Sequence, residues 1–111
     1  MESKSASKPF RFHPEAREDF RDAIRRYRAR STIASVEFRT TVSGAIRNVA
    51  HAPQLWPKFL QGTRRFVLHR FPFSLIYLDD HDVVTIIAVA HSKRKPGYWK
   101  HRISGPADFI R

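Results

Sequence analysis

The stretch from Phe71 to Arg102, FPFSLIYLDDHDVVTIIAVAHSKRKPGYWKHR, determines the fold and carries the candidate site. Two apolar, β-rich runs, Phe73 to Asp79 and Val83 to Ala90, are joined by a short polar turn that contains three aspartates. This pattern predicts a β-hairpin. The second run is apolar at nearly every position, so we expect a central strand with both faces covered.

A basic segment follows this hairpin, and no acidic residue lies between Asp82 and Asp108. Its basic residues, interleaved with Tyr98 and Trp99, are Lys93, Arg94, Lys95, Lys100 and Arg102. The whole chain has 21 Lys and Arg against 10 Asp and Glu, which gives a net charge of +11. Such a surface favours an anionic partner, either nucleic acid or an acidic protein, over a small neutral metabolite. A basic surface that only aids solubility is the plain alternative.

Composition limits the remaining possibilities. A chain of 111 residues forms one domain with a single core. The absence of cysteine excludes disulfides, a thiol nucleophile and cysteine-ligated zinc. The six histidines show no HxH or HxxxH spacing and no glycine-rich phosphate loop is present, so we expect no metal and no cofactor. No apolar run is long enough to span a bilayer, and we expect a cytoplasmic protein with no membrane partner.

The N-terminal half predicts one strand and two helices. Phe10 to His13 alternates apolar and polar residues, which indicates a short strand. Pro14 suits the first turn of a helix, and Ser31 or Thr32 can cap a second helix that ends near His51. The apolar stripe of the first helix is Ala16, Phe20, Ala23, Ile24 and Tyr27, and that of the second is Ala34, Phe38, Val42, Ile46 and Val49. The short link between them predicts an antiparallel helical hairpin.

The fold class that follows is α+β, in the order β-α-α-β-β-β. Residues 52–62 contain two prolines and are expected to be irregular, and Arg64 to His69 alternates as a strand near the edge of the sheet. We therefore expect a small antiparallel sheet of about four strands with the helical hairpin packed on one face. Residues 1–8 are expected to be a disordered leader, 9–103 the single domain and 104–111 a C-terminal tail.

The order of these pieces resembles the RelE/ParE superfamily of toxins from type II toxin–antitoxin, or plasmid stabilisation, modules. The resemblance rests on four stretches: Phe12 to Ala16; Arg64-Arg65-Phe66; Phe71-Pro72-Phe73 followed by Ile76-Tyr77; and Ala90 to Arg94 with Pro96, Tyr98, Trp99 and Arg102. It implies a toxin that inhibits growth and is neutralised by a cognate acidic antitoxin. It also implies that operator DNA is bound only through the antitoxin complex.

The superfamily divides on the cellular target. ParE-like members are known for acting on DNA gyrase, whereas RelE-like members cut mRNA on the ribosome. The lysine pair that RelE-like enzymes carry before the central strands has no clear counterpart here, where Lys58 stands alone. The Phe71-Pro72-Phe73 core and the tail from His91 to Trp99 look closer to ParE-like members and to the broader plasmid-stabilisation groups, some of whose targets are unassigned. The resemblance thus implies a gyrase-like or unassigned target, with a ribosome-dependent mRNA endoribonuclease as the alternative. A non-toxic basic nucleic-acid-binding module is the second alternative.

The resemblance also implies candidate site residues. In a metal-independent ribonuclease the catalytic residues would be Arg65, His91, Arg94 and Tyr98. Residues that would bind the target or the antitoxin are Arg64, Lys93, Lys95, Trp99, Lys100 and Arg102. Trp99 and Tyr98 can equally cap the sheet, Arg65 can be a solvated outer residue, and His91 can be structural. Whether the protein is an enzyme stays open, since catalysis requires His91 and Tyr98 to share one cleft with the arginines.

Overall fold

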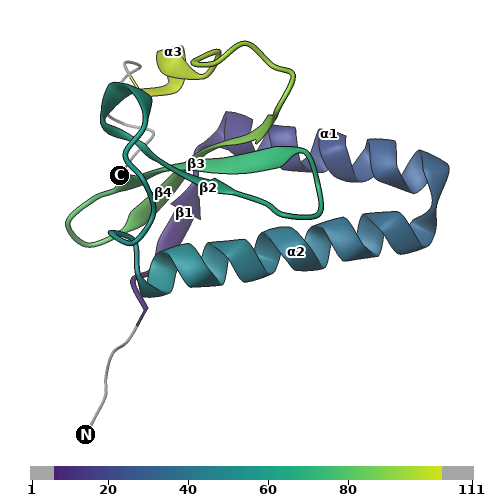
Figure 1. Ribbon diagram of the computed structural model, residues 1–111, viewed down its shortest axis with the longest axis horizontal. Coiled ribbons are helices and arrows are strands. Elements are labelled where there is room, and N and C mark those ends of the chain that lie inside the picture. The colour runs from purple at the N-terminus through teal and green to yellow at the C-terminus, as the bar shows by residue number, and fades with distance from the viewer. Residues whose placement is uncertain (1–6, 104–111) are drawn as a thin grey trace, which may run out of the picture.

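The computed structural model describes residues 7–103 and has two long helices packed on one side of a four-stranded sheet (Figure 1). The predicted tail, 104–111, and most of the predicted leader lie outside the described residues. In chain order the elements are β1 (Phe10–Phe12), α1 (Pro14–Arg30), α2 (Thr32–His51), the 3₁₀ turn η1 (Leu60–Gly62), β2 (Arg64–Val67), β3 (Phe73–Asp79), β4 (Val84–His91) and α3 (Lys100–Ile103). The predicted α+β class and the order of the first six main elements are confirmed.

The sheet has the strand order β1-β4-β3-β2. β2, β3 and β4 form an antiparallel meander, as predicted, whereas β1 pairs with β4 in parallel. The sheet is therefore mixed, because the helical hairpin carries the chain back across the sheet before β2 begins. β4 lies between β1 and β3, and its side chains pack in clusters on both faces of the sheet, which explains why its sequence is apolar on both faces.

Local chemistry sets the ends of the two long helices. The Nδ1 atom of His13 accepts a hydrogen bond from the backbone N–H of Glu15, and Pro14 occupies the first helical position of α1. Ser31 ends α1 and caps α2, since its Oγ accepts from the N–H of Ala34 at 3.2 Å. One residue thus separates the two helices, which pack side by side as the predicted hairpin (Figure 1).

The main core fills the space between the helical hairpin and one face of the sheet. Aromatic rings dominate it, with Phe38 of α2 packed 5.0 Å from both Tyr27 of α1 and Phe73 of β3, measured between ring centroids. Phe71 closes this cluster edge-on. Burial of this apolar area provides most of the stability of the fold.

The opposite face of the sheet is covered by the C-terminal segment that leads into α3 (Figure 1). Trp99 is only 1% exposed and packs on Ile76, Ile87 and Ala88. Gly97 makes the turn before it with a φ of +81°, a conformation that favours glycine. The segment between β4 and α3 therefore covers much of this second face, and Phe59 and Ile103 pack beside it.

Lys8, the last residue of the predicted leader, is bonded to the folded part. Its backbone N–H donates to the carbonyl of Ala50 at 3.0 Å, and its Nζ lies 2.8 Å from a carboxylate oxygen of Asp79. Within residues 7–103, no helix is long and apolar enough to cross a membrane.

Candidate functional site

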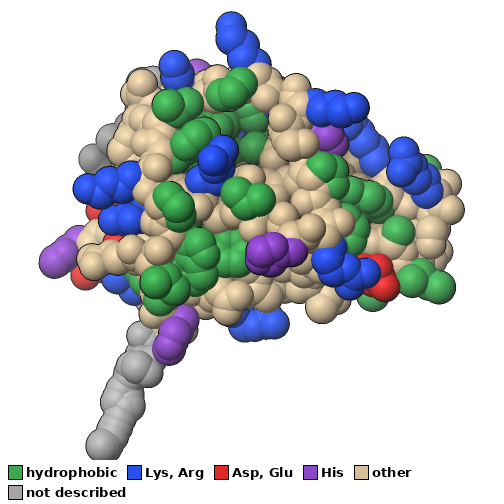
Figure 2. All heavy atoms as spheres, viewed as in Figure 1, with side chains coloured by type: hydrophobic (Ala, Val, Ile, Leu, Met, Phe, Trp, Pro, Cys, Tyr) green, Lys and Arg blue, Asp and Glu red, His purple; other side chains and the backbone are tan. Residues whose placement is uncertain are grey.

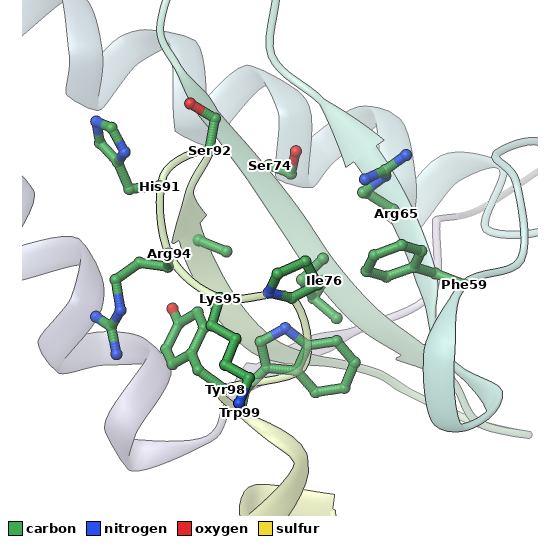
Figure 3. A pocket seen from close by; sticks show the side chains of 12 residues that line it. Phe59, Arg65, Ser74, Ile76, His91, Ser92, Arg94, Lys95, Tyr98 and Trp99 are labelled. Carbon is green, nitrogen blue, oxygen red and sulfur yellow. The ribbon is translucent and has the colours of Figure 1, made fainter.

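The four candidate catalytic residues border one hollow on the outer face of the sheet. This hollow, which we call the Trp99 hollow, measures about 390 Å³ and is lined by Arg65, His91, Arg94 and Tyr98 together with Phe59, Trp99 and six further residues (Figure 3). Its walls come from the chain before η1, from β2, β3 and the end of β4, and from the loop that follows β4. The four residues that the sequence analysis named as candidate catalytic residues therefore lie around the same hollow.

The register of the sheet nevertheless separates His91 from Arg65. Arg65 pairs with Ile76, and His91 pairs with Phe73. Paired residues in an antiparallel sheet project to the same face, and residues three apart on one strand project to opposite faces. Arg65 thus lies on the Trp99 face and His91 on the helix face, and Figure 3 shows their side chains at opposite ends of the hollow.

The imidazole of His91 is held on the helix side of the strand end. Its ring packs edge-on against Phe73, with 4.9 Å between the ring centroids. Its Nδ1 accepts a hydrogen bond from the backbone N–H of Lys93 at 3.0 Å, which shapes the first turn of the basic loop. The Nδ1 atom therefore has a structural role.

Two guanidinium groups are laid over aromatic rings at the edges of the hollow. The guanidinium carbon of Arg65 lies 4.3 Å from the ring centroid of Phe59, and that of Arg94 lies 3.8 Å from the ring of Tyr98. Cation–π contacts of this kind restrict an exposed arginine while leaving its N–H edge open to an anion.

A carboxylate that the sequence analysis did not single out holds the C-terminal segment in place. Asp19 of α1 accepts hydrogen bonds from the backbone N–H of Val89, from the Tyr98 hydroxyl and from two nitrogens of Arg102, at 3.1, 3.2, 2.7 and 3.2 Å. Arg102 also donates to the carbonyl of Ile87 at 2.9 Å. This cluster joins α1, β4 and α3.

Tyr98 is poorly placed to act as an acid or base. Burial, followed by the negative charge of Asp19, raises the pKa of its hydroxyl to about 12. The hydroxyl also donates to Asp19, which belongs to α1 and does not line the Trp99 hollow. A proton donor for chemistry near neutral pH needs a pKa much closer to that pH.

Three of the predicted binding residues have structural roles in this conformation. Arg102 is 5% exposed, and although burial alone would lower its pKa, the hydrogen bonds and charge of Asp19 raise it. Arg64 donates to the carbonyls of Gln54 and Trp56 and so anchors the segment before β2. The ring faces of Trp99 are buried on the sheet and cannot stack on a base.

The other predicted binding residues are on the surface. The loop between β4 and α3 contains the exposed residues Lys93, Arg94 and Lys95. The exposed Lys100 is the first residue of α3. His91, Arg94 and Tyr98 also line a second hollow of about 440 Å³ on the helix side, next to Asp22 and Arg26. On the face of the molecule shown in Figure 2, Lys and Arg side chains are spread around the outline and few acidic groups are visible.

The arrangement is suited to binding anionic groups. It offers exposed cations and oriented guanidinium groups. Among the candidate catalytic side chains, Arg65 and His91 project to opposite faces of the sheet, and the Tyr98 hydroxyl donates to Asp19.

Comparison with known proteins decides the family. A sequence-family model described as "ParE toxin of type II toxin-antitoxin system, parDE" matches residues 10–96. This chain belongs to the ParE toxin family. It is thus a type II toxin, and the predicted membership of the RelE/ParE superfamily is confirmed.

Solved structures agree on the fold of this ParE-family toxin. It matches a chain of the chromosomal ParDE TA system from P. aeruginosa with a TM-score of 0.58 and 17% sequence identity. The match covers 78% of this chain and 98% of that chain. A search of curated protein sequences gave no match.

Proposed function

We propose that this toxin inhibits growth by binding an essential protein target of the DNA gyrase type and does not cleave RNA. The observation that carries this proposal is the separation of His91 from Arg65 on opposite faces of the sheet. Cleavage of RNA without a metal needs groups that activate the 2′-hydroxyl, neutralise the phosphate and protonate the leaving oxygen at one place.

The state of Tyr98 supports the same proposal. Its hydroxyl proton is directed to Asp19, and a pKa of about 12 leaves it protonated and weakly acidic at neutral pH. His91 projects to the other face of the sheet, so its imidazole does not face Arg65 across the Trp99 hollow. The exposed cations then serve as contacts for a partner and not as catalysts.

We assign the target contacts to the exposed basic residues around the end of β4. These are Arg65, Lys93, Arg94, Lys95 and Lys100. Arg65 lies on β2 and Lys100 begins α3, while the other three lie in the loop between β4 and α3. Hydrogen bonds from Val89 and Arg102 to Asp19 hold both ends of this loop on α1. Charge of this kind accelerates encounter with an acidic surface and favours partners of opposite sign.

The partner that neutralises the toxin is, in this proposal, a cognate acidic antitoxin. A net charge of +11 leaves many cations that an acidic segment can cover, and coupled folding of such a segment gives a wide interface. Operator DNA would be bound through the antitoxin, and the toxin would act in the cytoplasm, where its target resides.

Two assays with purified toxin test the proposal. One measures supercoiling of relaxed plasmid by gyrase, and the other measures cleavage of mRNA on programmed ribosomes. We expect inhibition of supercoiling and intact mRNA. Ribosome-dependent cuts with unaffected supercoiling would refute the proposal.

A ribonuclease remains the second candidate because His91, Arg94, Tyr98 and Arg65 all contribute atoms to the lining of one hollow. The two candidates differ in their dependence on His91. Replacing His91 by Ala removes an acid or base from a ribonuclease and would abolish its cleavage. In a binding toxin the same change loses the hydrogen bond to the N–H of Lys93 and alters target affinity only modestly.

A further inference from the structure

Trp99 carries a polar group that the fold leaves without a partner. Trp99 is only 1% exposed. Within residues 7–103, its indole N–H makes no hydrogen bond. In the described part of the chain, the one fully buried side-chain nitrogen or oxygen without a hydrogen bond is Arg102 Nε. The indole nitrogen of Trp99 is therefore not fully buried and is reached from the hollow. Figure 3 shows the nitrogen-bearing edge of the ring turned toward the middle of the lining side chains. An N–H that has no protein acceptor and opens into a hollow can donate to a bound ligand.

The guanidinium groups of Arg65 and Arg94 border the same hollow. Each is stacked on a ring, at 4.3 Å from Phe59 and 3.8 Å from Tyr98. Neither makes a salt bridge to a carboxylate among the described residues. Their orientation is therefore set before any ligand arrives, which lowers the entropy cost of binding an anion.

No acidic residue lines the Trp99 hollow, and Lys95 adds a third cation at its rim. The carboxylate of Asp19 accepts from the Tyr98 hydroxyl, but it does not line the hollow and is paired with Arg102. Between the cations the walls are apolar, formed by Ile76, Pro96 and the edge of Trp99. The hollow thus combines N–H donors and positive charge with an apolar floor.

We infer that the Trp99 hollow is a receptor for a carboxylate side chain on an acidic, partly apolar segment of a partner protein. The Trp99 N–H is the donor inside the hollow, and the guanidinium groups of Arg65 and Arg94 stand at its two ends, where they attract the negative charge of the segment. Nucleic acid fits less well, because binding of single strands relies on open aromatic faces for base stacking. In this hollow the faces of Phe59 and Tyr98 already carry guanidinium groups, and those of Trp99 are buried.

This inference deepens the proposed function, because it places one contact of an acidic partner at a defined point of the toxin. Its test does not depend on toxicity or on the identity of the partner. A toxin that proves to act on the ribosome could still bind a carboxylate in the hollow, and a gyrase-type toxin could fail to do so.

Nuclear magnetic resonance of the folded chain tests the inference directly. The chain has two tryptophans, so a ¹H–¹⁵N spectrum contains two indole N–H signals, and Trp56 serves as the internal control. The probe is a decapeptide of alternating glutamate and leucine, and its matched control has glutamine at every glutamate position. We expect the glutamate peptide to move the Trp99 indole proton downfield and leave Trp56 in place. The glutamine peptide should bind at least about tenfold more weakly, because charge-assisted hydrogen bonds are lost.

Variants then assign the effect to the hollow. Arg65→Gln and Arg94→Gln should each weaken the peptide by about tenfold, whereas Arg28→Gln, an exposed position on α1, should not change it. A Trp99 signal that stays in place, or moves equally with the glutamine peptide, would overturn the inference. It would also be overturned if a single-stranded RNA decanucleotide moved the signal and the acidic peptide did not.

Discussion

Asp19 is the residue on which the C-terminal part of the molecule depends. Its carboxylate receives four hydrogen bonds, two of them from Arg102, and the Asp19–Arg102 pair is largely shielded from water. Removing one partner of a buried pair leaves the other charge without compensation, which costs more than the pair itself contributes.

Arg102→Ala should therefore be strongly destabilising. We expect the free energy of unfolding to fall by about 3 kcal/mol, measured by urea denaturation, because Asp19 is left buried and unpaired. Arg28→Ala, at an exposed position, is the control and should change stability by less than about 0.5 kcal/mol. A loss below about 1 kcal/mol for Arg102→Ala would show that the pair does not hold α3 in place.

Tyr98 provides a test of the same cluster through pH. Its pKa is raised to about 12, and a group whose pKa is higher in the folded state stabilises the fold at pH values below its unfolded value. The contribution is therefore complete below about pH 10 and is lost as the pH rises from about 10 through about 12. Stability of the wild type should fall more steeply across this window than that of Tyr98→Phe. Equal slopes would mean that burial and the charge of Asp19 do not keep the proton on the Tyr98 hydroxyl in the folded state.

At the scale of elements, His13 determines where α1 begins. It is buried, and burial lowers the pKa of its imidazole even though Glu15 acts in the opposite direction. The neutral ring is the form whose Nδ1 accepts the N–H of Glu15. The lowered pKa means that this contribution is present above about pH 6.5 and is lost as the pH falls below it.

His13→Ala should lower the free energy of unfolding at pH 8 by about 1 kcal/mol, as loss of a helix N-cap does. His13→Asn should recover most of this loss, since an amide oxygen can accept the same hydrogen bond. Thermal unfolding of the wild type should also become easier between about pH 6.5 and pH 5, and His13→Asn should lack that step. A wild type whose stability is flat in this range would contradict the assigned role of His13.

The sequence was sufficient to predict the elements because their signals are local. Alternation, helical spacing and capping residues lie within a few positions of each other, and the hairpin of β3 and β4 followed from two apolar runs and one turn. The parallel pairing of β1 with β4 had no local signal, since the partners are separated by more than 70 positions. Topology of this kind depends on how the helical hairpin crosses the sheet.

The sequence indicates which residues could form the candidate site, but it does not predict how their side chains are placed relative to one another. Separation of His91 and Arg65 depends on the register of two strand pairs, and a shift by one residue would reverse a face. Asp19 is not evident as a site residue in the sequence because acidic residues are common near the N-terminal end of a helix. Its position is one turn from both Ala16 and Ala23, on the apolar stripe, and an acid on that stripe signals a buried partner.

At the scale of the whole molecule, the charge of +11 affects the free toxin and its complex in opposite ways. Repulsion among the cations destabilises the free fold, and an acidic partner that covers them stabilises it by binding the folded state. The toxin should thus be more resistant to unfolding in its complex than alone.

Salt provides the test of this repulsion. Raising the ionic strength from about 0.01 M to about 0.1 M shortens the screening length from about 30 Å to about 10 Å. We expect the melting temperature of the free toxin to rise over this range in calorimetry with a weakly binding salt. A fall would mean that surface ion pairs such as Lys8–Asp79 and Arg70–Glu37 outweigh the repulsion.

The most direct test of a binding toxin, as opposed to an RNA-cleaving one, is pulse labelling after tightly controlled induction in a bacterial host. Incorporation of labelled thymidine and of labelled methionine is followed in the same culture, with uninduced cells as the reference. Action on a gyrase-type target predicts that DNA synthesis falls first while protein synthesis continues. Loss of protein synthesis before DNA synthesis would contradict this account and would identify the toxin as a ribonuclease.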